Sequence, residues 1–326
     1  MDSHTAGEPF RVVTGGVPPI PGASMVAKRR WATEHLDGLR RSLMWEPRGH
    51  ADMYGCFLTE AVTPGADFGV LFMHNDGFST MCGHGIIAMA TVAVTTGMIP
   101  AADPETRMTI DTPAGAIVAF ARLERGRVAS VRFQNVPSYL AARDHSVEVA
   151  GLGTVRYDLA FGGAFYAYVD ANSLGLILAP PRTRELIDAG MAIKRAVAAK
   201  QAIEHPYEPD LGFLYGTILI GPAEKVGHHS RNVCIFADGE VDRSPTGTGV
   251  SGRVAIHYAR GEIGLNEPIT IESILGTTFT AKVIGETDFG PHGAVLTEVE
   301  GAAAITGRNE FFLDPEDEIG GGFLLK

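Results

Sequence analysis

An internal repeat most strongly limits the folds open to this chain. The segment Cys82–Gly85 reads Cys-Gly-His-Gly, and the segment Thr246–Gly249 reads Thr-Gly-Thr-Gly. Fifteen residues after the first residue of each copy stand Gly97 and Gly261, where the C-cap glycine of a helix is expected. Matching offsets at both ends indicate a duplication rather than a coincidence among the 40 glycines of the chain. The repeat therefore predicts two similar halves, each with one helix that begins at a glycine-rich turn.

Short strand-like runs fill most of the remaining chain, and glycine, proline, aspartate and asparagine bound them. Helical patterns are fewer. Residues 86–96 are apolar on all sides, residues 183–204 are amphipathic, and residues 252–260 predict a shorter helix. The pattern favours an α/β (α+β) chain with a first domain over residues 1–155 and a second over residues 156–304. Residues 305–326 could then return to the first domain as a strand.

Charge and cysteine content exclude several classes of protein. The formal net charge of −11 leaves no basic footprint for nucleic acid or an anionic membrane surface. The nearest basic cluster, at residues 28–30 and 40–41, is interpreted as a solvated face or a flank of the active site. Three cysteines, an odd and sparse count, indicate reduced thiols and a cytoplasmic protein. The longest apolar run, Ile86–Val94, is far shorter than the about 20 residues that span a bilayer.

Cys82 is the residue of the repeat with reactive chemistry. It stands at the predicted start of a helix, where the positive end of the helix dipole lowers the pKa of a cysteine thiol from about 8.5. Its thiolate would then act as a base near neutral pH. The backbone N–H groups of Gly83 and His84 follow, and they can bind a substrate carboxylate. Cys56 and Cys234 lie inside strand-like runs and are interpreted as structural.

The second copy of the repeat adds a group that can bind a cation. Asp242 precedes Thr246 by four residues and can pair with an ammonium or a secondary amine. A turn or a surface ion pair with Arg243 is the structural alternative. The amides of Gly247 and Thr248 offer a second place for a carboxylate. A small amino-acid zwitterion would therefore find an anion site and a cation site together.

Three segments resemble signatures of the proline racemase superfamily. They are Asp2–Pro9, which reads DSHTAGEP, Met81–Gly85, which reads MCGHG, and Asp242–Gly249, which reads DRSPTGTG. The resemblance extends over nearly the whole chain. It implies the diaminopimelate-epimerase-like fold, in which each of two similar halves wraps a curved, mostly antiparallel sheet around a central helix.

The resemblance also implies a reaction. Racemases and epimerases of the family carry a cysteine in both glycine-rich motifs, so that one thiolate removes the Cα proton and the other thiol protonates the opposite face. Here Cys82 is the first of the pair, but Thr246 stands in the second place, and an alcohol is a poor acid or base near neutral pH. This pairing resembles trans-3-hydroxy-L-proline dehydratases, which form Δ1-pyrroline-2-carboxylate without a metal or organic cofactor.

The site residues expected from motif and resemblance fall into two groups. Cys82 and Thr246 are the catalytic candidates. The substrate-binding candidates are Gly83, His84, Asp242, Gly247 and Thr248. The donor of a proton to the leaving hydroxyl is left open between Cys82, Thr246 and His84.

Other interpretations carry less support. Gly247–Gly252 matches the dinucleotide-binding pattern G-x-G-x-x-G, with Glu272 at 20 residues beyond it, but no strand runs directly into the first glycine. The scattered histidines match no zinc motif, and nothing marks an acyl-transfer scaffold for Cys82 as a nucleophile. A hydroxyproline or proline epimerase and a non-catalytic amino-acid-binding protein stay as alternatives. The expected partner is a small imino-acid substrate, with no nucleic acid and no membrane, and a homodimer is left open.

Overall fold

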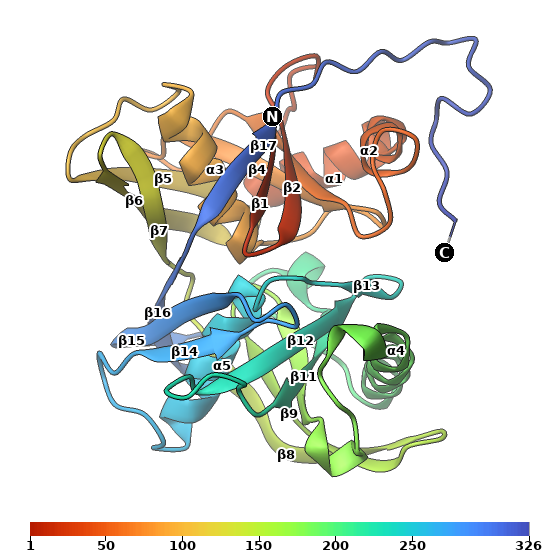
Figure 1. Cartoon of the computed structure of the whole chain (residues 1–326), viewed down its shortest axis with the longest axis vertical. Coiled ribbons are helices and arrows are strands. Elements are labelled where there is room, and N and C mark those ends of the chain that lie inside the picture. Colours follow the sequence, from red (N-terminus) through yellow and green to blue (C-terminus); the bar gives the residue numbers. More distant parts are fainter. Residues whose placement is uncertain (326) are drawn as a thin grey trace. The chain divides into compact units, whose positions relative to one another are not determined.

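Two helices of equal length form the centres of the repeat. In the structure, a computed structural model that describes residues 1–325, helix α3 spans Gly83–Thr95 and helix α5 spans Gly247–Ala259 (Figure 1). Each has 13 residues. Both are followed by a glycine in the left-handed conformation, Gly97 with φ of 75° and Gly261 with φ of 72°. The starts and stops predicted by the repeat are thus confirmed, whereas the shorter helix predicted over residues 252–260 begins five residues earlier, at Gly247.

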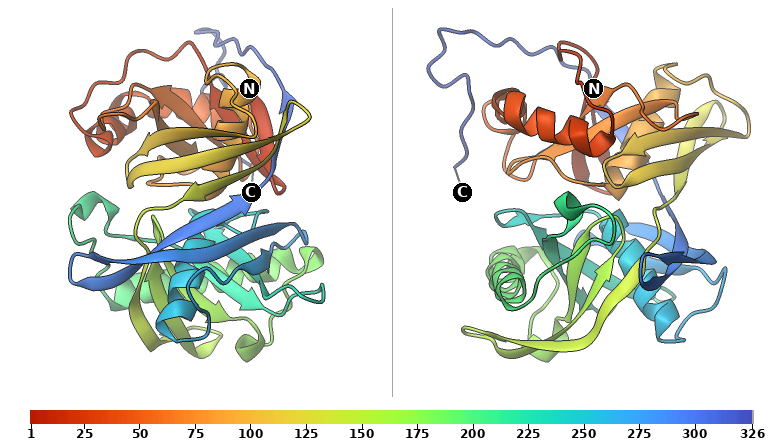
Figure 2. Two further views of the ribbon diagram at one scale, coloured as in Figure 1. Left: turned by 90° about the vertical axis from the view of Figure 1, so that its left-hand side faces the viewer. Right: turned by 180° about the vertical axis from the view of Figure 1, so that it is seen from behind.

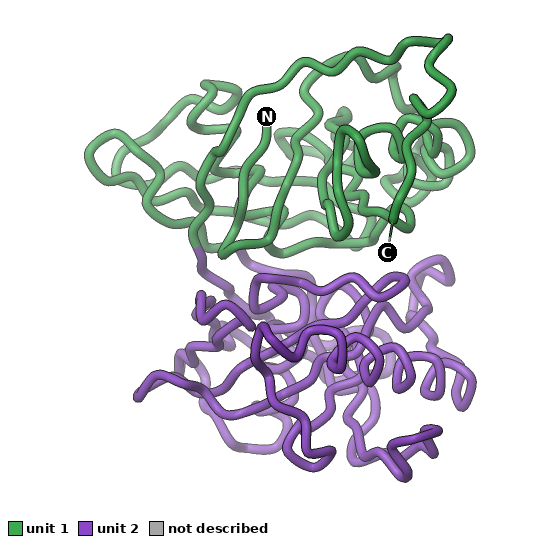
Figure 3. Tube along the Cα trace, turned by 45° about the vertical axis from the view of Figure 1, so that its right-hand side comes forward, with its two compact units in different colours: residues 1–132, 302–326 green, residues 133–301 purple. Residues whose placement is uncertain are grey.

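The chain divides into two compact units (Figure 3). The first contains Met1–Arg132 and the segment from Ala302 to the C-terminal end, and the second contains Phe133–Gly301. The first boundary between the units follows residue 132 and not residue 155, where the sequence predicts it. Residue 155 lies inside strand β9 (Gly153–Phe161). The reason is that β9 and its partner strand β8 (Tyr139–Val149) both pack on helix α5 of the second unit.

The first unit folds a mixed sheet around α3. Its strands are β1 (Asp2–Thr5), β2 (Glu8–Val13), β3 (Tyr54–Thr59), β4 (Phe68–His74), β5 (Glu105–Thr112), β6 (Gly115–Glu124) and β17 (Ala303–Gly307). They pair in the order β17-β1-β2-β3-β4-β5-β6, antiparallel except for the parallel pairs β2-β3 and β4-β5. Helix α3 contacts strands from both ends of this order, namely β17, β1, β2, β5 and β6, so the sheet curves around it. Strand β7 (Arg127–Gln134) leads into the second unit.

The second unit repeats this arrangement. Its further strands are β10 (Phe165–Asp170), β11 (Leu214–Gly221), β12 (Ser230–Phe236), β13 (Glu240–Val241), β14 (Ile269–Glu272), β15 (Thr278–Phe289) and β16 (His292–Gly301). The order is β8-β9-β10-β11-β12-β14-β15-β16, again with two parallel pairs, β10-β11 and β12-β14, and β13 adds to β12. Helix α5 contacts β8, β9, β15 and β16. The alternation of parallel and antiparallel pairs is the same in both units, which confirms the two similar halves.

The remaining helices cover the sheets. Helices α1 (Met25–His35) and α2 (Asp37–Met44) pack on β4, and α4 (Thr183–Lys200) packs on β8, β11 and β12 (Figure 2). Short 3-10 helices lie at Asn172–Leu174, Pro180–Arg182 and Pro209–Leu211. Helix α4 matches the predicted amphipathic segment, and α3 is buried all round as expected. Of the helices in residues 1–325, none is long and apolar enough to cross a membrane.

The apolar pattern of the sequence does not predict α1 and α2. Of the two interpretations of their basic residues, the solvated face is wrong for Lys28 and Arg40. These side chains are only 5% and 3% exposed. The ammonium of Lys28 donates to Thr59 Oγ1 at 2.8 Å, and Arg40 Nη1 donates to the carbonyls of His74 and Asn75 at 2.8 and 2.7 Å. Their aliphatic stems cover the sheet while their polar heads satisfy buried acceptors.

Candidate active site

Cys82 is the N-cap residue of α3. Its backbone is extended, with φ of −143°, and its Sγ accepts a hydrogen bond from the N–H of Gly85 at 3.2 Å. The carbonyl of Cys82 accepts the first helical bond, from Ile86 at 2.9 Å. The amides of Gly83 and His84 precede that bond and are the first two donors of the helix, which have no acceptor within a helix. The sulfur therefore lies at the positive end of α3 beside two amides oriented for an anion.

His84 is the nearest titratable neighbour of the thiol. Its Nδ1 lies 3.2 Å and its Nε2 lies 3.5 Å from Cys82 Sγ. The rings of Tyr54 and Phe10 enclose the imidazole edge-on, with centroid separations of 4.8 and 5.7 Å. Burial lowers the pKa of His84 to about 3. The imidazole is therefore neutral at neutral pH and acts on the sulfur through a hydrogen bond, because it carries no charge.

Two further residues of the first unit fix this geometry. The hydroxyl of Thr5 donates to the carbonyl of His84 at 2.9 Å, which ties the amino-terminal motif to the start of α3. Gly85 leaves the space next to the sulfur. A Cβ there would lie 2.7 Å from ring atoms of Phe10 and Phe72 and 3.0 Å from Cys82 Sγ. Thr5 and His84 are 79 residues apart, so no local pattern reveals this hydrogen bond, although Thr5 belongs to the amino-terminal motif.

Asp242 begins the corresponding site in the second unit. It follows β13 and is only 4% exposed. One of its oxygens accepts from the backbone N–H of Ser244 at 2.7 Å. Burial raises the pKa of this carboxyl to about 6, against the opposing effects of Ser244, Thr246 and Arg243. An ionised Asp242 is thus held in a place where a bound cation would stabilise it.

Thr246 is the N-cap residue of α5 and differs from Cys82 in backbone conformation. Its φ of 68° and ψ of 93° are rare for a β-branched residue, and its side chain makes no capping hydrogen bond. Its hydroxyl is buried and has no well-aligned hydrogen-bond partner in residues 1–325. The same hydroxyl lies near enough to Asp242 to favour the carboxylate form. The strained residue thus holds a buried polar atom ready for a partner.

Thr248 and the glycines beside it are held by two tyrosines. The hydroxyls of Tyr166 and Thr248 lie 2.7 Å apart, and Tyr168 donates to the carbonyl of Gly249 at 2.8 Å. The Thr248 hydroxyl is already hydrogen-bonded to Tyr166. The groups that can bind an anion at this helix start are therefore the backbone N–H groups of Gly247 and Thr248. No sequence motif indicates the two tyrosines, since strand β10 carries them about 80 residues upstream.

The structure brings the predicted residues together within each unit. Cys82, Gly83 and His84 gather at the start of α3. Asp242, Thr246, Gly247 and Thr248 gather at the start of α5. Cys56 and Cys234 are fully buried in β3 and β12, and burial raises the pKa of the Cys56 thiol, which fits a structural role. Within residues 1–325, no group of three or more His, Cys, Asp or Glu residues could hold a metal ion.

Glu272, the acidic residue of the dinucleotide-binding alternative, has a structural role. Its carboxylate accepts from Arg231 at 2.9 Å and from His228 at 2.8 Å. It also accepts from the backbone N–H groups of Glu224 and Lys225, each at 2.9 Å. Burial raises the pKa of Glu272, but these hydrogen bonds outweigh it and lower the pKa to about 2. The side chain is fully buried and engaged, so it is not available to a ribose.

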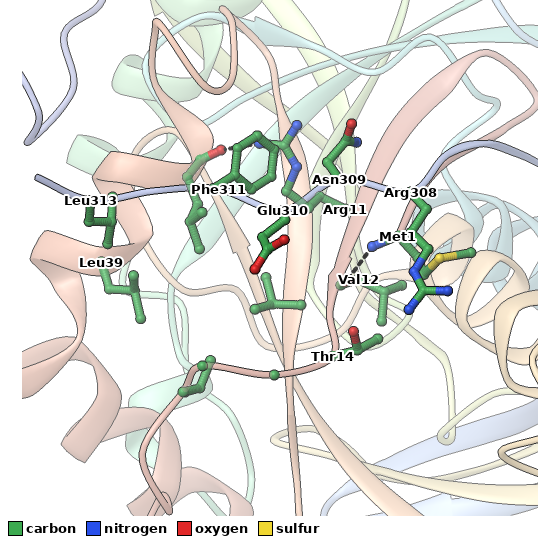
Figure 4. A pocket seen from close by; sticks show the side chains of 15 residues that line it. Met1, Arg11, Val12, Thr14, Leu39, Arg308, Asn309, Glu310, Phe311 and Leu313 are labelled. Carbon is green, nitrogen blue, oxygen red and sulfur yellow. Dashed lines mark hydrogen bonds between the residues drawn. The ribbon is translucent and has the colours of Figure 1, made fainter.

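A cavity of about 690 Å³ lies elsewhere in the first unit, between the residues after β2 and the carboxy-terminal segment (Figure 4). Arg11 stacks over the ring of Phe311 with 4.3 Å between guanidinium and centroid. Its donors are already engaged, by the carbonyls of Leu43 and Arg48 and by both oxygens of Asp2. No residue of the Cys82 motif lines this cavity.

Comparison with known proteins agrees with the motifs. The family model for proline racemase matches residues 1–324. A trans-3-hydroxy-L-proline dehydratase of Colwellia psychrerythraea is 48% identical over 100% of this chain and 92% of its own length. A 3-hydroxyproline 2-epimerase of Burkholderia multivorans is 47% identical over 100% of this chain and 97% of its own length.

A solved structure shares the fold as well. It is a hydroxyproline epimerase from Agrobacterium vitis with bound trans-4-hydroxy-L-proline, 32% identical, with a TM-score of 0.94 over 99% of this chain and 94% of the other. The fold expected from the resemblance is thereby confirmed. Motifs, fold and full-length similarity agree: the chain belongs to the proline racemase family.

Proposed function

We propose that this protein is a hydro-lyase that converts trans-3-hydroxy-L-proline to Δ1-pyrroline-2-carboxylate. The observation that carries the proposal is the pair of helix N-caps. One is Cys82, with a thiol at the positive end of α3, and the other is Thr246, with an alcohol at the equivalent place of α5. One base and one neutral hydroxyl suit the removal of a single proton followed by loss of water. The dehydratase of Colwellia psychrerythraea, similar over the full chain, supports this substrate.

The first step is proton abstraction. The Cys82 thiolate removes the Cα proton, and the neutral imidazole of His84 stabilises the thiolate by donating an N–H. The C–H electron pair moves toward the carboxylate, whose growing charge is stabilised by amides such as those of Gly83 and His84. The C–H electron pair then forms the double bond between Cα and C3 while the C3–O pair leaves with the oxygen. The proton taken by Cys82, passed on directly or through Thr246 or His84, converts this oxygen to water and restores the thiolate. The enamine so formed tautomerises to the cyclic imine in water.

In the proposed reaction, the residues at the start of α5 bind the substrate and assist the departure of its hydroxyl. Asp242, ionised at neutral pH because its pKa is about 6, binds the secondary ammonium of the substrate. The amides of Gly247 and Thr248 bind its carboxylate. The Thr246 hydroxyl, buried with no well-aligned partner in the described part of the chain, donates a hydrogen bond to the departing 3-hydroxyl. Every step up to the enamine uses only side chains and amides of this chain.

Product analysis tests the proposal. The purified protein is incubated with trans-3-hydroxy-L-proline, and the cyclic imine is identified by mass spectrometry after reduction. A parallel sample with L-proline in D2O follows the Cα proton by NMR and the configuration by chiral chromatography. We expect imine from the first substrate, and at most slow exchange with retention from the second. Fast racemisation of proline would contradict the one-base mechanism.

Epimerisation at C2 is the second candidate, because the similar protein from Burkholderia multivorans is a 3-hydroxyproline 2-epimerase. It requires an acid on the face opposite Cys82, and Thr246 offers only an alcohol there in the motif. Accumulation of the 2-epimer of trans-3-hydroxy-L-proline, without imine, would select this function. We further propose a cytoplasmic location, because all three cysteines are reduced thiols.

A further inference from the structure

Helix α5 carries a buried cation where the matching helix is apolar. Arg253 lies seven residues after the N-cap Thr246, and Met89 lies seven residues after the N-cap Cys82. Both side chains are buried, with exposed fractions of 3% and 0%. Burial lowers the pKa of Arg253 to about 10, so the guanidinium stays charged at neutral pH. A cation in a position that methionine fills in the sister helix costs stability and calls for a function.

Neutral groups hold this cation. Arg253 Nη1 donates to Asn232 Oδ1 at 2.8 Å, and Nη2 donates to Ser230 Oγ at 3.0 Å. Its Nε and Nη2 also lie 3.3 and 3.0 Å from His257 Nε2. Within the described chain, no carboxylate bonds to the guanidinium directly. One acidic residue, Glu262, is linked to it through the other nitrogen of His257.

Asn232 carries the constraint to the peptide bond that precedes Thr246. Because Arg253 holds its Oδ1, the Nδ2 of Asn232 is directed at the carbonyl of Pro245, to which it donates at 3.1 Å. The N–H of the same peptide belongs to Thr246 and donates to Ser244 Oγ at 3.1 Å. The orientation of this peptide plane determines φ of Thr246. Hydrogen bonds at both of its ends therefore hold φ at 68°.

The first unit needs no such device. Cys82 has an ordinary extended backbone, and the N–H of Gly85 holds its sulfur directly. Met89 serves only to fill the core at the corresponding place. Thr246, in contrast, has a rare backbone conformation and no hydrogen bond from its helix to its side chain. The buried polar side chains Arg253 and Asn232 are thus present only in the unit whose N-cap residue has an unfavourable backbone conformation that must be held in place.

We propose that Arg253 and Asn232 are positioning residues that hold the Thr246 hydroxyl in place for the departure of the substrate hydroxyl. The inference rests on the proposed function, since it gives Thr246 a part in the loss of water. Neither residue contacts the substrate in this scheme. Both act through the Pro245–Thr246 peptide. Their loss should therefore affect the loss of water and not proton removal by Cys82.

The test compares two reactions in the full-length protein. Arg253→Met introduces the residue of the sister helix, and Asn232→Leu removes the bond to Pro245. Ser230→Ala is the matched control, because it removes another bond of Arg253 but leaves the branch to Pro245. We expect kcat for imine formation to fall roughly 10–100-fold in the first two variants, as for a misplaced catalytic group. In the same two variants, the rate of exchange of the Cα proton of L-proline in D2O should change little, and KM for trans-3-hydroxy-L-proline should stay close to the wild-type value.

A double-mutant cycle with Thr246→Ala separates positioning from general damage. If Arg253 acts through Thr246, Arg253→Met should cause no further loss of imine formation in the Thr246→Ala background. Equal losses of exchange and imine formation, or losses that add in the double variant, would overturn the inference. Asn232→Leu repeats the cycle if Arg253→Met does not fold. If the wild-type protein forms no imine, the proposed function itself is wrong. If the wild type forms imine but the losses of the two substitutions add, only the positioning inference is wrong.

Discussion

The sulfur of Cys82 lies 3.2 Å from Nδ1 of His84, a histidine whose pKa is lowered to about 3 by burial. The pair differs from a thiolate–imidazolium ion pair, because the imidazole is neutral throughout the working range of pH. In the proposed mechanism the thiolate is therefore stabilised by dipoles, namely the helix N-terminus, the N–H of Gly85 and a neutral N–H of His84. To remove a Cα proton, the thiolate must accept that proton and become a neutral thiol. A thiolate stabilised by dipoles accepts a proton more readily than a thiolate held in a tight ion pair.

Replacement of Cys82 by alanine should abolish imine formation and the exchange of the Cα proton of L-proline, since both begin with the same base. Cys56→Ala and Cys234→Ala are the controls, because both side chains are fully buried in strands. They should lose stability without losing the reaction. Iodoacetamide should inactivate the wild-type protein, and a bound substrate analogue should protect it. Full activity in the Cys82→Ala protein would contradict the mechanism.

Asp242→Asn should weaken substrate binding and stabilise the free protein. Loss of one partner of a buried charge pair costs about 2–5 kcal/mol, so the substrate concentration for half-saturation should rise by a large factor. The folded pKa of about 6 exceeds the ordinary 3.8, so ionisation of Asp242 reduces stability as pH rises from 3.8 to 6, by roughly 3 kcal/mol. Thermal melting at pH 7.5 should therefore give a higher Tm for the variant. An unchanged saturation curve would make Asp242 structural.

Acid should destabilise the protein through His84. The folded pKa of about 3 lies below the ordinary 6.5, so the unfolded chain binds the proton first. Stability is complete above about pH 6.5 and is lost as pH falls from 6.5 toward 3. His84→Gln keeps a neutral N–H donor without titrating in this range. Denaturant melts from pH 7 to 4 should show a smaller loss of the free energy of unfolding in the variant than in the wild type, and equal slopes would contradict the burial of a neutral ring.

Gly85→Ala should damage both stability and activity. The new Cβ would lie 2.7 Å from the buried rings of Phe10 and Phe72 and 3.0 Å from Cys82 Sγ, so the rings or the sulfur must move. Such overpacking typically costs about 1–3 kcal/mol. Gly38→Ala is the matched control, because no atom lies within 4 Å of its added Cβ in α2. Chemical denaturation and imine assays on both variants would show the difference, and equal behaviour would exclude the steric argument.

Thr246→Cys should add an acid on the second helix start. We expect slow racemisation of L-proline in this variant where the wild type gives only exchange with retention, together with a reduced rate of imine formation. The unusual φ of 68° also restricts the new side chain, so the gain should be small. Thr246→Ser, which keeps an alcohol, is the control and should not racemise. Chiral chromatography measures the outcome, and racemisation by the serine variant would show that another group is the acid.

The sequence alone determined the elements that depend on local chemistry. Glycine spacing predicted the centres of α3 and α5 and their ends, because left-handed C-caps need glycine at Gly97 and Gly261. Motifs also located Cys82 and Thr246 at helix starts. The apolar periodicity does not indicate helices α1 and α2, because their inward faces include the polar residues Lys28 and Arg40. These side chains can be buried because they donate hydrogen bonds to acceptors that are distant in the sequence.

How the site residues ionise and which way they face depends on the tertiary structure. A histidine exposed to water titrates near neutral pH, yet burial beside Tyr54 and Phe10 keeps His84 neutral. Burial also keeps a proton on Asp242 up to about pH 6. The carbonyl that precedes Thr246 accepts a hydrogen bond from Asn232, 14 residues upstream of Thr246. Desolvation and long-range hydrogen bonds are sums over neighbours from several strands and helices, so no local pattern in the chain contains them.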